Sequence, residues 1–533
     1  MPSQFVRGPG PIHHLESRAD ASPQVYRPIR FVYVLLVTVV IGILLRAFSF
    51  EVAGLDWDES LYIVMAQRWL RGDLPYVNIW DQHPPGLPAI FALMQMVISD
   101  GVLAARVAAL LAVSLTSALL FASSDRFIKN RLAAYLASLL YLVVMTRPDG
   151  LAGNTEVFNN LLVTAAAYFL LPEFLKQEAS IRHGRVLFAA FLLGVGLQIK
   201  YVVFPEATLL CSAVLIRYWS LGIGLRRILL TALLSILAGL LPTFAVVLYF
   251  LDMDALQQFL DANFRANVDY LDVPLSFATA LSRLRFGLLP ISCFAVWALV
   301  TVVLLQFYAR SPTERWFGTF LVVWLIAVAI DIALPLKFWK HYFNALLPPL
   351  SLTAGLGCVL VGRAFLRAFA LATSVALAVT MAPIVALLVK HAPDSRSIGR
   401  LNVPEAVAEQ IEAGGTDGRD VYLFNYDPIV YAYAHAKPPT RYVLGIELAD
   451  FSVSSGALAL LEVNRLLMST PKWIVIAEPS PYDFGESIWT RLQAMLRGYQ
   501  LYGAWSESDY IQPPIQVRLY RRKGDGGVKS DIR

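Results

Sequence analysis

Charge, cysteine and nucleotide-binding motifs are all scarce in this sequence. Asp, Glu, Lys and Arg make up 16% of the 533 residues, whereas 57% are hydrophobic and the mean hydropathy is +0.58. The three cysteines all lie within apolar runs, which excludes a disulfide framework and the usual spacing of a zinc site (Cys211, Cys293 and Cys358). The chain has no Gly-rich phosphate loop and no nucleophile elbow. A soluble protein of this size and a nucleotide pocket are therefore not expected.

The sequence has instead a series of apolar runs, most of them long enough to cross a membrane. Eleven runs are recognisable, and they predict an all-α polytopic membrane protein with about 11 transmembrane helices. No cleavable signal peptide is expected in the polar, Pro-containing start of the chain. Lys200 and Pro205 interrupt one pair of runs. The runs lie near residues 31–48, 102–122, 132–146, 157–172, 187–202, 203–219, 228–250, 286–308, 316–334, 343–361 and 366–389.

Basic residues fall in alternate loops between these runs. With 11 spans, the basic loops and the N-terminal segment 1–30 all lie on one side, which the positive-inside rule makes cytoplasmic. The acid-rich loop 49–101 then lies on the outer side of the plasma (inner) membrane, as does the region after the last span. The net charge of +5 is carried by the cytoplasmic loops and does not indicate a nucleic-acid partner.

Two outer segments are expected to lie at the membrane surface. Residues 86–98 are apolar but too short to span, and they follow Pro84-Pro85, which suits the start of a helix. Residues 253–271 carry apolar side chains at three- and four-residue spacing, which is typical of an interfacial amphipathic helix.

The composition becomes that of a soluble protein from about residue 390. Helix-like and strand-like patterns alternate there, which predicts a small soluble α/β domain over 390–520 on the outer side. A disordered tail is expected over 521–533. The helix patterns lie at 403–413 and 488–496, and the strand patterns at 421–424, 473–477 and 516–520.

Unusual polar residues gather on the predicted outer face. Carboxylates there can remove or orient a proton, and cations at a membrane surface can hold a lipid phosphate. The carboxylates and one histidine lie in loop 49–101, whereas the other cations and Tyr342 lie at later span ends. The candidates are Asp56, Asp58, Glu59, Asp81, His83, Arg147, Lys200, His341 and Tyr342.

The order of these motifs resembles that of the GT-C glycosyltransferases, in particular the protein O-mannosyltransferases and their bacterial relatives that modify lipids and envelope glycans. The resemblance covers roughly residues 30–390, a transmembrane domain over 31–389 with its catalytic loop at 49–101. The motifs are Asp58-Glu59, Tyr62, Gly72 with Pro75-Tyr76, Asp81-Gln82-His83-Pro84-Pro85, Asn154-Thr155-Glu156 and His341-Tyr342-Phe343-Asn344-Ala345-Leu346-Leu347-Pro348-Pro349.

The resemblance implies transfer of a hexose or pentose from a polyprenyl-phosphate sugar on the outer face, with inversion at the anomeric carbon. It assigns Asp58 as the base for the acceptor and Glu59 as its support. Asp81 and His83 would shape the site beside the lipid phosphate. The predicted phosphate-binding residues are Arg147, Lys200 and His341, with Tyr342 beside them. Loop 252–285 is too short for the soluble domain that mannosyltransferases carry in an outer loop, which favours a lipid or glycan acceptor over a protein.

Other interpretations stay open at this point. A transporter or flippase for an envelope lipid or glycan is the main alternative, although it calls for charges near the middle of the membrane or an inverted repeat. A non-catalytic assembly or sensor protein is another. A divalent metal is also left open, with Asp81, His83 and His341 as candidate ligands, although their spacing is no metal signature.

Overall fold

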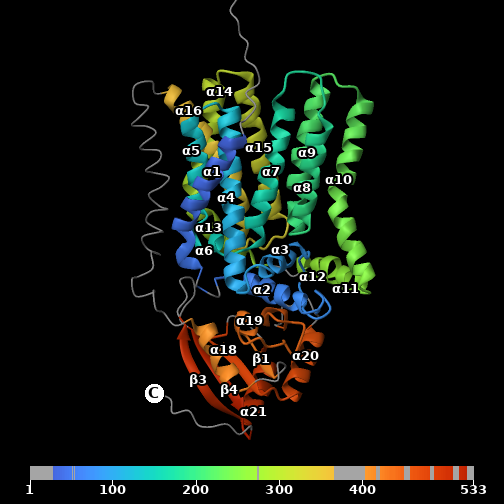
Figure 1. The fold of residues 1–533 in the computed structure, drawn as a ribbon, viewed down its shortest axis with the longest axis vertical. Helices are drawn as coiled ribbons and strands as arrows, with labels where there is room; N and C mark the ends of the chain where they lie inside the picture. The colour runs from blue at the N-terminus through green and yellow to red at the C-terminus, as the bar shows by residue number, and fades with distance from the viewer. Residues whose placement is uncertain are drawn as a thin grey trace, which may run out of the picture.

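The computed structural model describes residues 28–50, 52, 55–272, 275–364, 402–415, 420–448, 456–480, 485–507 and 515–524. A bundle of long helices forms one part, and a smaller domain with a β-sheet lies at one end of it (Figure 1). We call this end of the bundle the domain-side end. The opposite end carries the loops that the sequence predicts to be cytoplasmic.

Ten described helices occupy the predicted spans. Eight candidate membrane spans among the described residues have the length and composition to cross a bilayer, and α5 and α8 are shorter apolar helices in two further predicted spans. The predicted span 366–389 lies outside the described residues. The protein is therefore a multi-pass membrane protein. The bundle helices are α1 (Pro28–Arg46), α4 (Gly101–Phe127), α5 (Arg131–Val144), α7 (Thr155–Leu175), α8 (His183–Leu197), α9 (Phe204–Ser220), α10 (Leu225–Asp252), α14 (Ser292–Tyr308), α15 (Pro312–Ala333) and α16 (Leu347–Ala364).

Side-chain caps and small residues explain how these helices begin and pack. Asp100 and Asn130 each accept a backbone N–H in the first turn of the helix that follows, α4 and α5. A Cβ atom on Gly194 of α8 would lie 2.1 Å from the carbonyl oxygen of Gly239 on α10, so glycine is required where these two helices touch. Close contact of this kind replaces the hydrophobic driving force that is missing within a bilayer.

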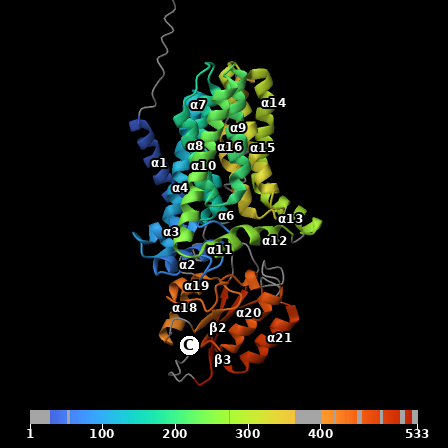
Figure 2. The same ribbon diagram turned by 90° about the vertical axis from the view of Figure 1, so that its right-hand side faces the viewer.

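Short helices lie between the bundle and the C-terminal domain (Figure 2). Two of them belong to the loop 49–101, and three follow α10. The predicted surface segment 86–98 forms α3, and 253–271 forms α11, a π turn (Asp261–Arg265) and α12. These short helices are α2 (Trp57–Leu70), α3 (Gly86–Gln95), α11 (Leu256–Leu260), α12 (Ala266–Asp272) and α13 (Phe277–Leu288).

The C-terminal domain is α/β, with a four-stranded sheet in the order β1-β2-β4-β3. β1 is parallel to β2, whereas β4 is antiparallel to both of its neighbours. The sequence patterns correspond to α18, α21, β1, β2 and β4. The elements are α18 (Val403–Ala413), β1 (Val421–Leu423), α19 (Ile429–Tyr433), α20 (Gly456–Met468), β2 (Trp473–Glu478), α21 (Gly485–Leu496), β3 (Tyr499–Glu507) and β4 (Ile515–Arg522).

Two features of this domain differ from the expectation. β3 was not predicted because it is an edge strand whose residues are mostly exposed or half-buried, so its apolar pattern is weak. The tail predicted from residue 521 begins too early, because β4 pairs with both neighbours through Arg521 and Arg522. Arg521 is itself buried in this sheet. Residues 525–533 of the predicted tail lie outside the described residues.

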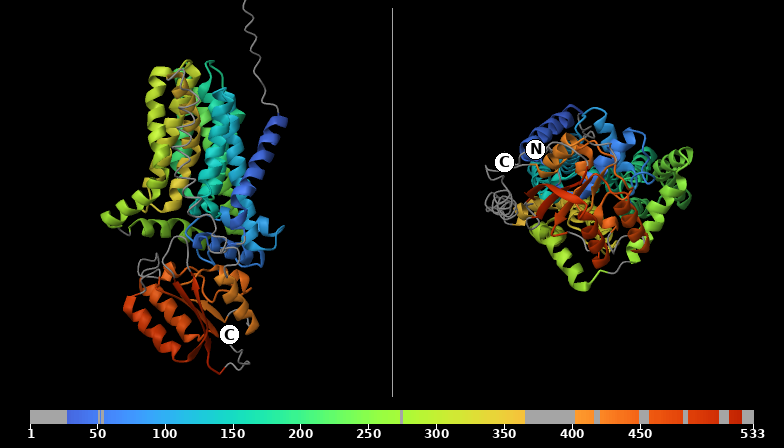
Figure 3. Two further views of the ribbon diagram at one scale, coloured as in Figure 1. Left: turned by 90° about the vertical axis from the view of Figure 1, so that its left-hand side faces the viewer. Right: turned by 90° about the horizontal axis from the view of Figure 1, so that it is seen from below.

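The C-terminal domain lies against the short helices of the loop 49–101 (Figures 1 and 3), and polar contacts hold it there. The backbone N–H of Trp80 donates to the carbonyl of Arg441 at 2.8 Å, and Lys437 Nζ lies 2.9 Å from Asp73 Oδ1. Asp427 is buried at this junction and accepts the backbone N–H of Ile429, the first residue of α19, at 2.9 Å. Gln67 of α2 donates to the carbonyl of Ala432 in α19 at 3.4 Å. The domain therefore docks on the helix that carries the predicted base.

This docking predicts a pH-dependent stability. Burial raises the pKa of Asp427 from 3.8 to about 7, so the folded protein holds this proton more tightly than the unfolded chain. The stabilisation is complete below about pH 4 and is lost as the pH rises through about 7. Asp427→Asn cannot titrate, so its melting temperature in detergent should fall less than that of the wild type between these pH values. Asp420→Asn, at a half-buried position in the same domain, is the matched control. Parallel melting profiles for wild type and Asp427→Asn would contradict the prediction.

Candidate active site

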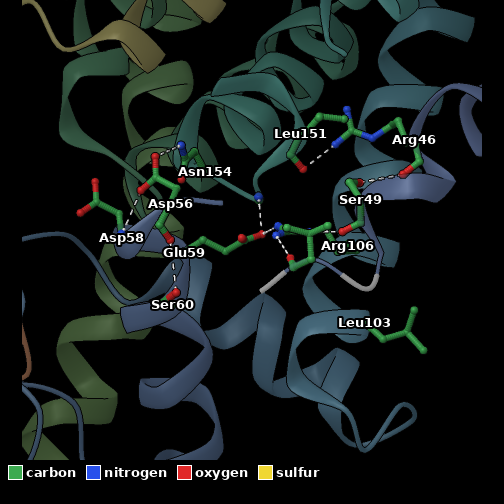
Figure 4. Close-up of polar contacts among 12 residues, drawn as sticks. Arg46, Ser49, Asp56, Asp58, Glu59, Ser60, Leu103, Arg106, Leu151 and Asn154 are labelled. Carbon is green, nitrogen blue, oxygen red and sulfur yellow. Dashed lines mark hydrogen bonds and ion pairs between the residues drawn. The ribbon is translucent and has the colours of Figure 1, made fainter. Parts of the chain in front are cut away.

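The first turn of α2 presents two aspartates from one helix end. Asp56 is the N-cap, and its Oδ1 accepts the backbone N–H of Asp58 at 2.9 Å. Its Oδ2 accepts the Asn154 side-chain amide at 3.0 Å (Figure 4). Asp56 is thus held on both carboxylate oxygens. Asp58 is half-buried, and its side chain points away from that of Glu59.

Glu59 lies behind the site rather than in it. Its carboxylate is buried, forms an ion pair with Arg106 of α4 and accepts the backbone N–H of Gly153 at 2.6 Å. Arg106 also donates to the carbonyls of Ser49 and Val52 at 3.1 and 3.0 Å (Figure 4). These bonds fasten α2 to α4 and to the segment before α7. The predicted support from Glu59 takes the form of anchoring the helix.

A second pair follows α2 in the loop. Nδ1 of His83 lies 2.9 Å from Asp81 Oδ1 and 3.2 Å from the Tyr62 hydroxyl. Burial alone would lower the pKa of His83, but the adjacent Asp81 carboxylate outweighs it and raises the pKa above the ordinary value. Tyr76 donates to the backbone carbonyl of His83 at 2.9 Å and has a left-handed φ of +68°, a conformation that is costly for a bulky residue. The strained Tyr76 residue therefore holds the backbone at His83 through its hydroxyl group.

The predicted cations come from the bundle side. Lys200, just before α9, lies 2.6 Å from Glu156 Oε1 in the first turn of α7. Its Nζ also lies 4.0 Å from the ring centroid of Tyr342, a cation–π contact. The ring of His341 packs edge-on against Tyr342, with centroids 4.9 Å apart. Both rings belong to a 3-10 helix, η5 (Lys340–Leu346), between α15 and α16.

Arg147 joins the same 3-10 helix at a different residue. Its Nη2 donates to Asn344 Oδ1 at 2.5 Å, and Asn344 in turn donates to the carbonyl of Asp149 at 2.7 Å. Asn160 donates to the Asn344 carbonyl at 3.0 Å. Arg147 is buried, and its Nε has no hydrogen-bond partner among the described residues. Arg147 therefore braces η5 and keeps one donor for a further group.

The carboxyl groups of Asp56 and Asp58 both have raised pKa values, which suits them to exchange protons. Burial raises the pKa of Asp56 to about 7, and the charge of Asp58 adds to the effect. Burial also raises the pKa of Asp58, with the positive charge of His83 opposing and the negative charge of Asp81 reinforcing it. A carboxylate with a raised pKa is a stronger base, which suits it to accept a proton from a hydroxyl.

A metal finds little support in this arrangement. Over the part of the chain that the structure describes, no group of three or more His, Cys, Asp or Glu side chains is placed to hold a metal ion. Asp81 and His83 are adjacent, and the ring of His341 packs on Tyr342. Oδ2 of Asp81 is buried without a hydrogen-bond partner among the described residues.

The C-terminal domain contributes one group that sequence reasoning missed. Glu447 is buried in the segment that docks on Trp80, and burial together with the charges of Asp81 and Asp58 raises its pKa well above the ordinary value. Composition does not reveal which face of a domain docks, so no sequence signal pointed to this residue.

Comparison with known proteins agrees with this geometry. The family model described as dolichyl-phosphate-mannose-protein mannosyltransferase matches residues 82–250. The apo structure of ArnT from Cupriavidus metallidurans is 16% identical in sequence, with a TM-score of 0.59 over 94% of this chain and 99% of ArnT. ArnT bound to undecaprenyl phosphate matches with a TM-score of 0.57 at the same identity and coverage. The chain has a GT-C fold. No curated protein sequence is a significant match.

The GT-C fold confirms the predicted fold class. The charges of Asp81, His83 and Lys200 all act on Asp58, and Lys200 contacts Tyr342 beside His341, so these predicted residues share one site. Arg147 contacts Asn344 of η5, whereas the carboxylate of Glu59 points away from Asp58 and toward Arg106 of α4. The residues that share the site come from α2, its following loop, α7, the start of α9 and η5.

The anchoring role of Glu59 can be tested by stability. Glu59→Gln preserves size but leaves Arg106 buried without its counter-ion, and loss of one partner of a buried ion pair costs about 3–5 kcal/mol. Its melting temperature in detergent should therefore fall clearly below that of the wild type. The matched control is Asp58→Asn, one residue away and half-buried, which should melt like the wild type. A wild-type melting temperature for Glu59→Gln would exclude the anchoring role.

Proposed function

We propose that the protein is an integral-membrane glycosyltransferase that moves a sugar from a polyprenyl-phosphate donor to a lipid or glycan acceptor on the outer face of the membrane, with inversion at the anomeric carbon. The observation that carries the proposal is the division of the site into two halves. Carboxylates gather on α2 and its loop, whereas Lys200, His341 and Tyr342 face them from the bundle. A lipid-phosphate donor is supported by two similar proteins. One is ArnT, whose structure binds undecaprenyl phosphate, and the other is the dolichyl-phosphate-mannose-protein mannosyltransferase family.

The acidic half supplies the base. The acceptor hydroxyl must lose its proton as its oxygen bonds to the anomeric carbon, and Asp58 takes that proton. Asp56 is held by Asn154 and by the backbone N–H of Asp58 itself, so it fixes the first turn of α2. Asp81 and His83 pair with each other. We assign Asp58 as the base because its carboxylate is half-buried and forms no ion pair within the described part of the chain.

The cationic half stabilises the leaving group. As the bond between the anomeric carbon and the phosphate oxygen breaks, the released lipid phosphate gains one negative charge. Lys200, whose Nζ lies 4.0 Å from the ring centroid of Tyr342, supplies the positive charge for the phosphate. Glu156 Oε1 lies 2.6 Å from Lys200 Nζ and positions it. Attack opposite the departing phosphate inverts the configuration.

The short segment after α10 indicates which type of acceptor is favoured. Between α10 and α14, the described residues form only the short helices α11, α12 and α13. The folded domain that mannosyltransferases insert in an outer loop has no room here. A lipid or glycan acceptor is therefore favoured over a protein. A transporter is not favoured, since α2, which carries the proposed base, lies at one end of the bundle and not along its axis (Figure 1).

The proposed base is tested by Asp58→Asn. Asn is nearly isosteric with Asp but does not accept a proton, so turnover with a synthetic polyprenyl-phosphate sugar should fall about a hundredfold or more. The melting temperature and the affinity for the lipid donor should stay near those of the wild type. Glu59→Gln is the comparison, because its activity loss should follow its loss of stability. A folded Asp58→Asn protein with near-normal turnover would exclude Asp58 and make Asp56 or Asp81 the next candidate.

A further inference from the structure

Two acidic side chains lie inside the membrane-spanning helices and play no part in the proposed reaction. Glu206 is in the first turn of α9 and Asp331 is in the last turn of α15, and each is 4% exposed. Trp324 Nε1 of α15 donates to Glu206 Oε1 at 2.7 Å, and the two carboxyl groups are close enough to hydrogen-bond to each other when one is protonated. Oδ1 of Asp331 is buried without a hydrogen-bond partner among the described residues. Two ionised carboxylates cannot form such a bond, so the pair holds at least one proton.

This pair is costly in a bilayer. Acidic side chains inside transmembrane helices are rare and usually functional, because an apolar pair packs there without the desolvation penalty. A hydrogen bond between two helices has one property that apolar packing lacks, which is a defined distance between named atoms. The bond from Trp324 to Glu206 joins α15 to α9, and the adjacent carboxyl pair adds a second link at their domain-side ends.

These two helix ends lead directly to the candidate phosphate site. Lys200 precedes α9 by the single 3-10 turn Tyr201–Val203, and α15 is followed by η5, which carries His341 and Tyr342. The contact between Lys200 and Tyr342, at 4.0 Å, joins the two chain segments that leave these helices. A shift of α9 against α15 would change this distance.

The chain between α15 and η5 is strained. Leu336 and Phe338 have left-handed φ values of +53° and +48°, although neither is glycine. They flank Lys337, whose carbonyl accepts a hydrogen bond from Arg283 at 3.0 Å. Strain of this kind persists only where the surrounding structure holds the backbone. The carboxyl pair at Asp331 holds the end of α15 from which this strained turn starts.

We infer that Glu206 and Asp331 form a proton-sharing clamp that positions Lys200 against the His341–Tyr342 segment and so sets the affinity for the phosphate of the donor. Both are positioning residues, since neither touches the substrate. The inference rests on the proposed function for the identity of the bound group, whereas the clamp itself is a property of the fold.

The test compares purified full-length variants for donor KM, kcat and melting temperature. Glu206→Gln and Asp331→Asn keep a hydrogen bond to the protonated partner, so each should retain the wild-type donor KM. Glu206→Leu leaves Asp331 unpaired and should raise donor KM about tenfold with a smaller change in kcat. The double variant Glu206→Leu/Asp331→Leu should regain melting temperature, because no buried acid is left unpaired, but it should keep the raised donor KM.

The matched control lies at the other end of α15. Glu314→Gln breaks the ion pair with Arg363, whose two nitrogens lie 2.7 Å from the carboxylate, and should lower the melting temperature without changing donor KM. A wild-type donor KM for both Glu206→Leu and the double variant would overturn the inference.

Failure of the proposed function gives a different result. A wild-type protein that neither transfers sugar from the lipid donor nor gains melting temperature with polyprenyl phosphate would exclude that function. The clamp is still tested then by a double-mutant cycle on melting temperature. Coupling between Glu206→Leu and Asp331→Leu supports the clamp, whereas additive losses would exclude it.

Discussion

The ion pair between Glu59 and Arg106 is the interaction on which the rest of the site depends. α2 does not span the membrane, so an anchor must hold it against the end of the bundle. Glu59 provides that anchor through Arg106 on α4 and through the backbone of Gly153. The residue after Gly153 is Asn154, which holds Asp56. One buried charge pair therefore sets the place of α2 and brings the acidic half of the site to the start of α7.

Polar groups in this protein are few, and most of the buried ones are paired. Lys200 bonds Glu156, His83 bonds Asp81, and Arg147 bonds Asn344, each across a chain turn or between elements. An unpaired charge is costly in a low-dielectric environment. The pairing of these side chains therefore determines which polar groups remain available to bind a ligand. The C-terminal domain completes the enclosure by packing Glu447 beside the acidic half.

Most of the bundle was predictable because transmembrane helices need long apolar runs, and these runs are visible residue by residue. The separate directions of Asp58 and Glu59 were also accessible, since neighbouring residues on a helix point about 100° apart. Glu206 and Asp331 were not predicted as functional residues, although acids within apolar runs are rare. The bonds that join distant segments, such as Lys200 to Glu156, were not accessible, because periodicity describes one helix and does not say which helices meet. The same holds for Asp427 and Glu447, whose roles depend on how the C-terminal domain docks.

Donor class and stereochemistry together test the central claim most directly. The purified protein in lipid nanodiscs is incubated with an acceptor lipid extract and either a synthetic polyprenyl-phosphate sugar or a nucleotide sugar. The anomeric configuration of the product is then determined by NMR. The account predicts transfer from the lipid donor alone, with a linkage opposite in configuration to the donor. Transfer from the nucleotide sugar with none from the lipid donor, or a product that retains the donor configuration, would contradict it.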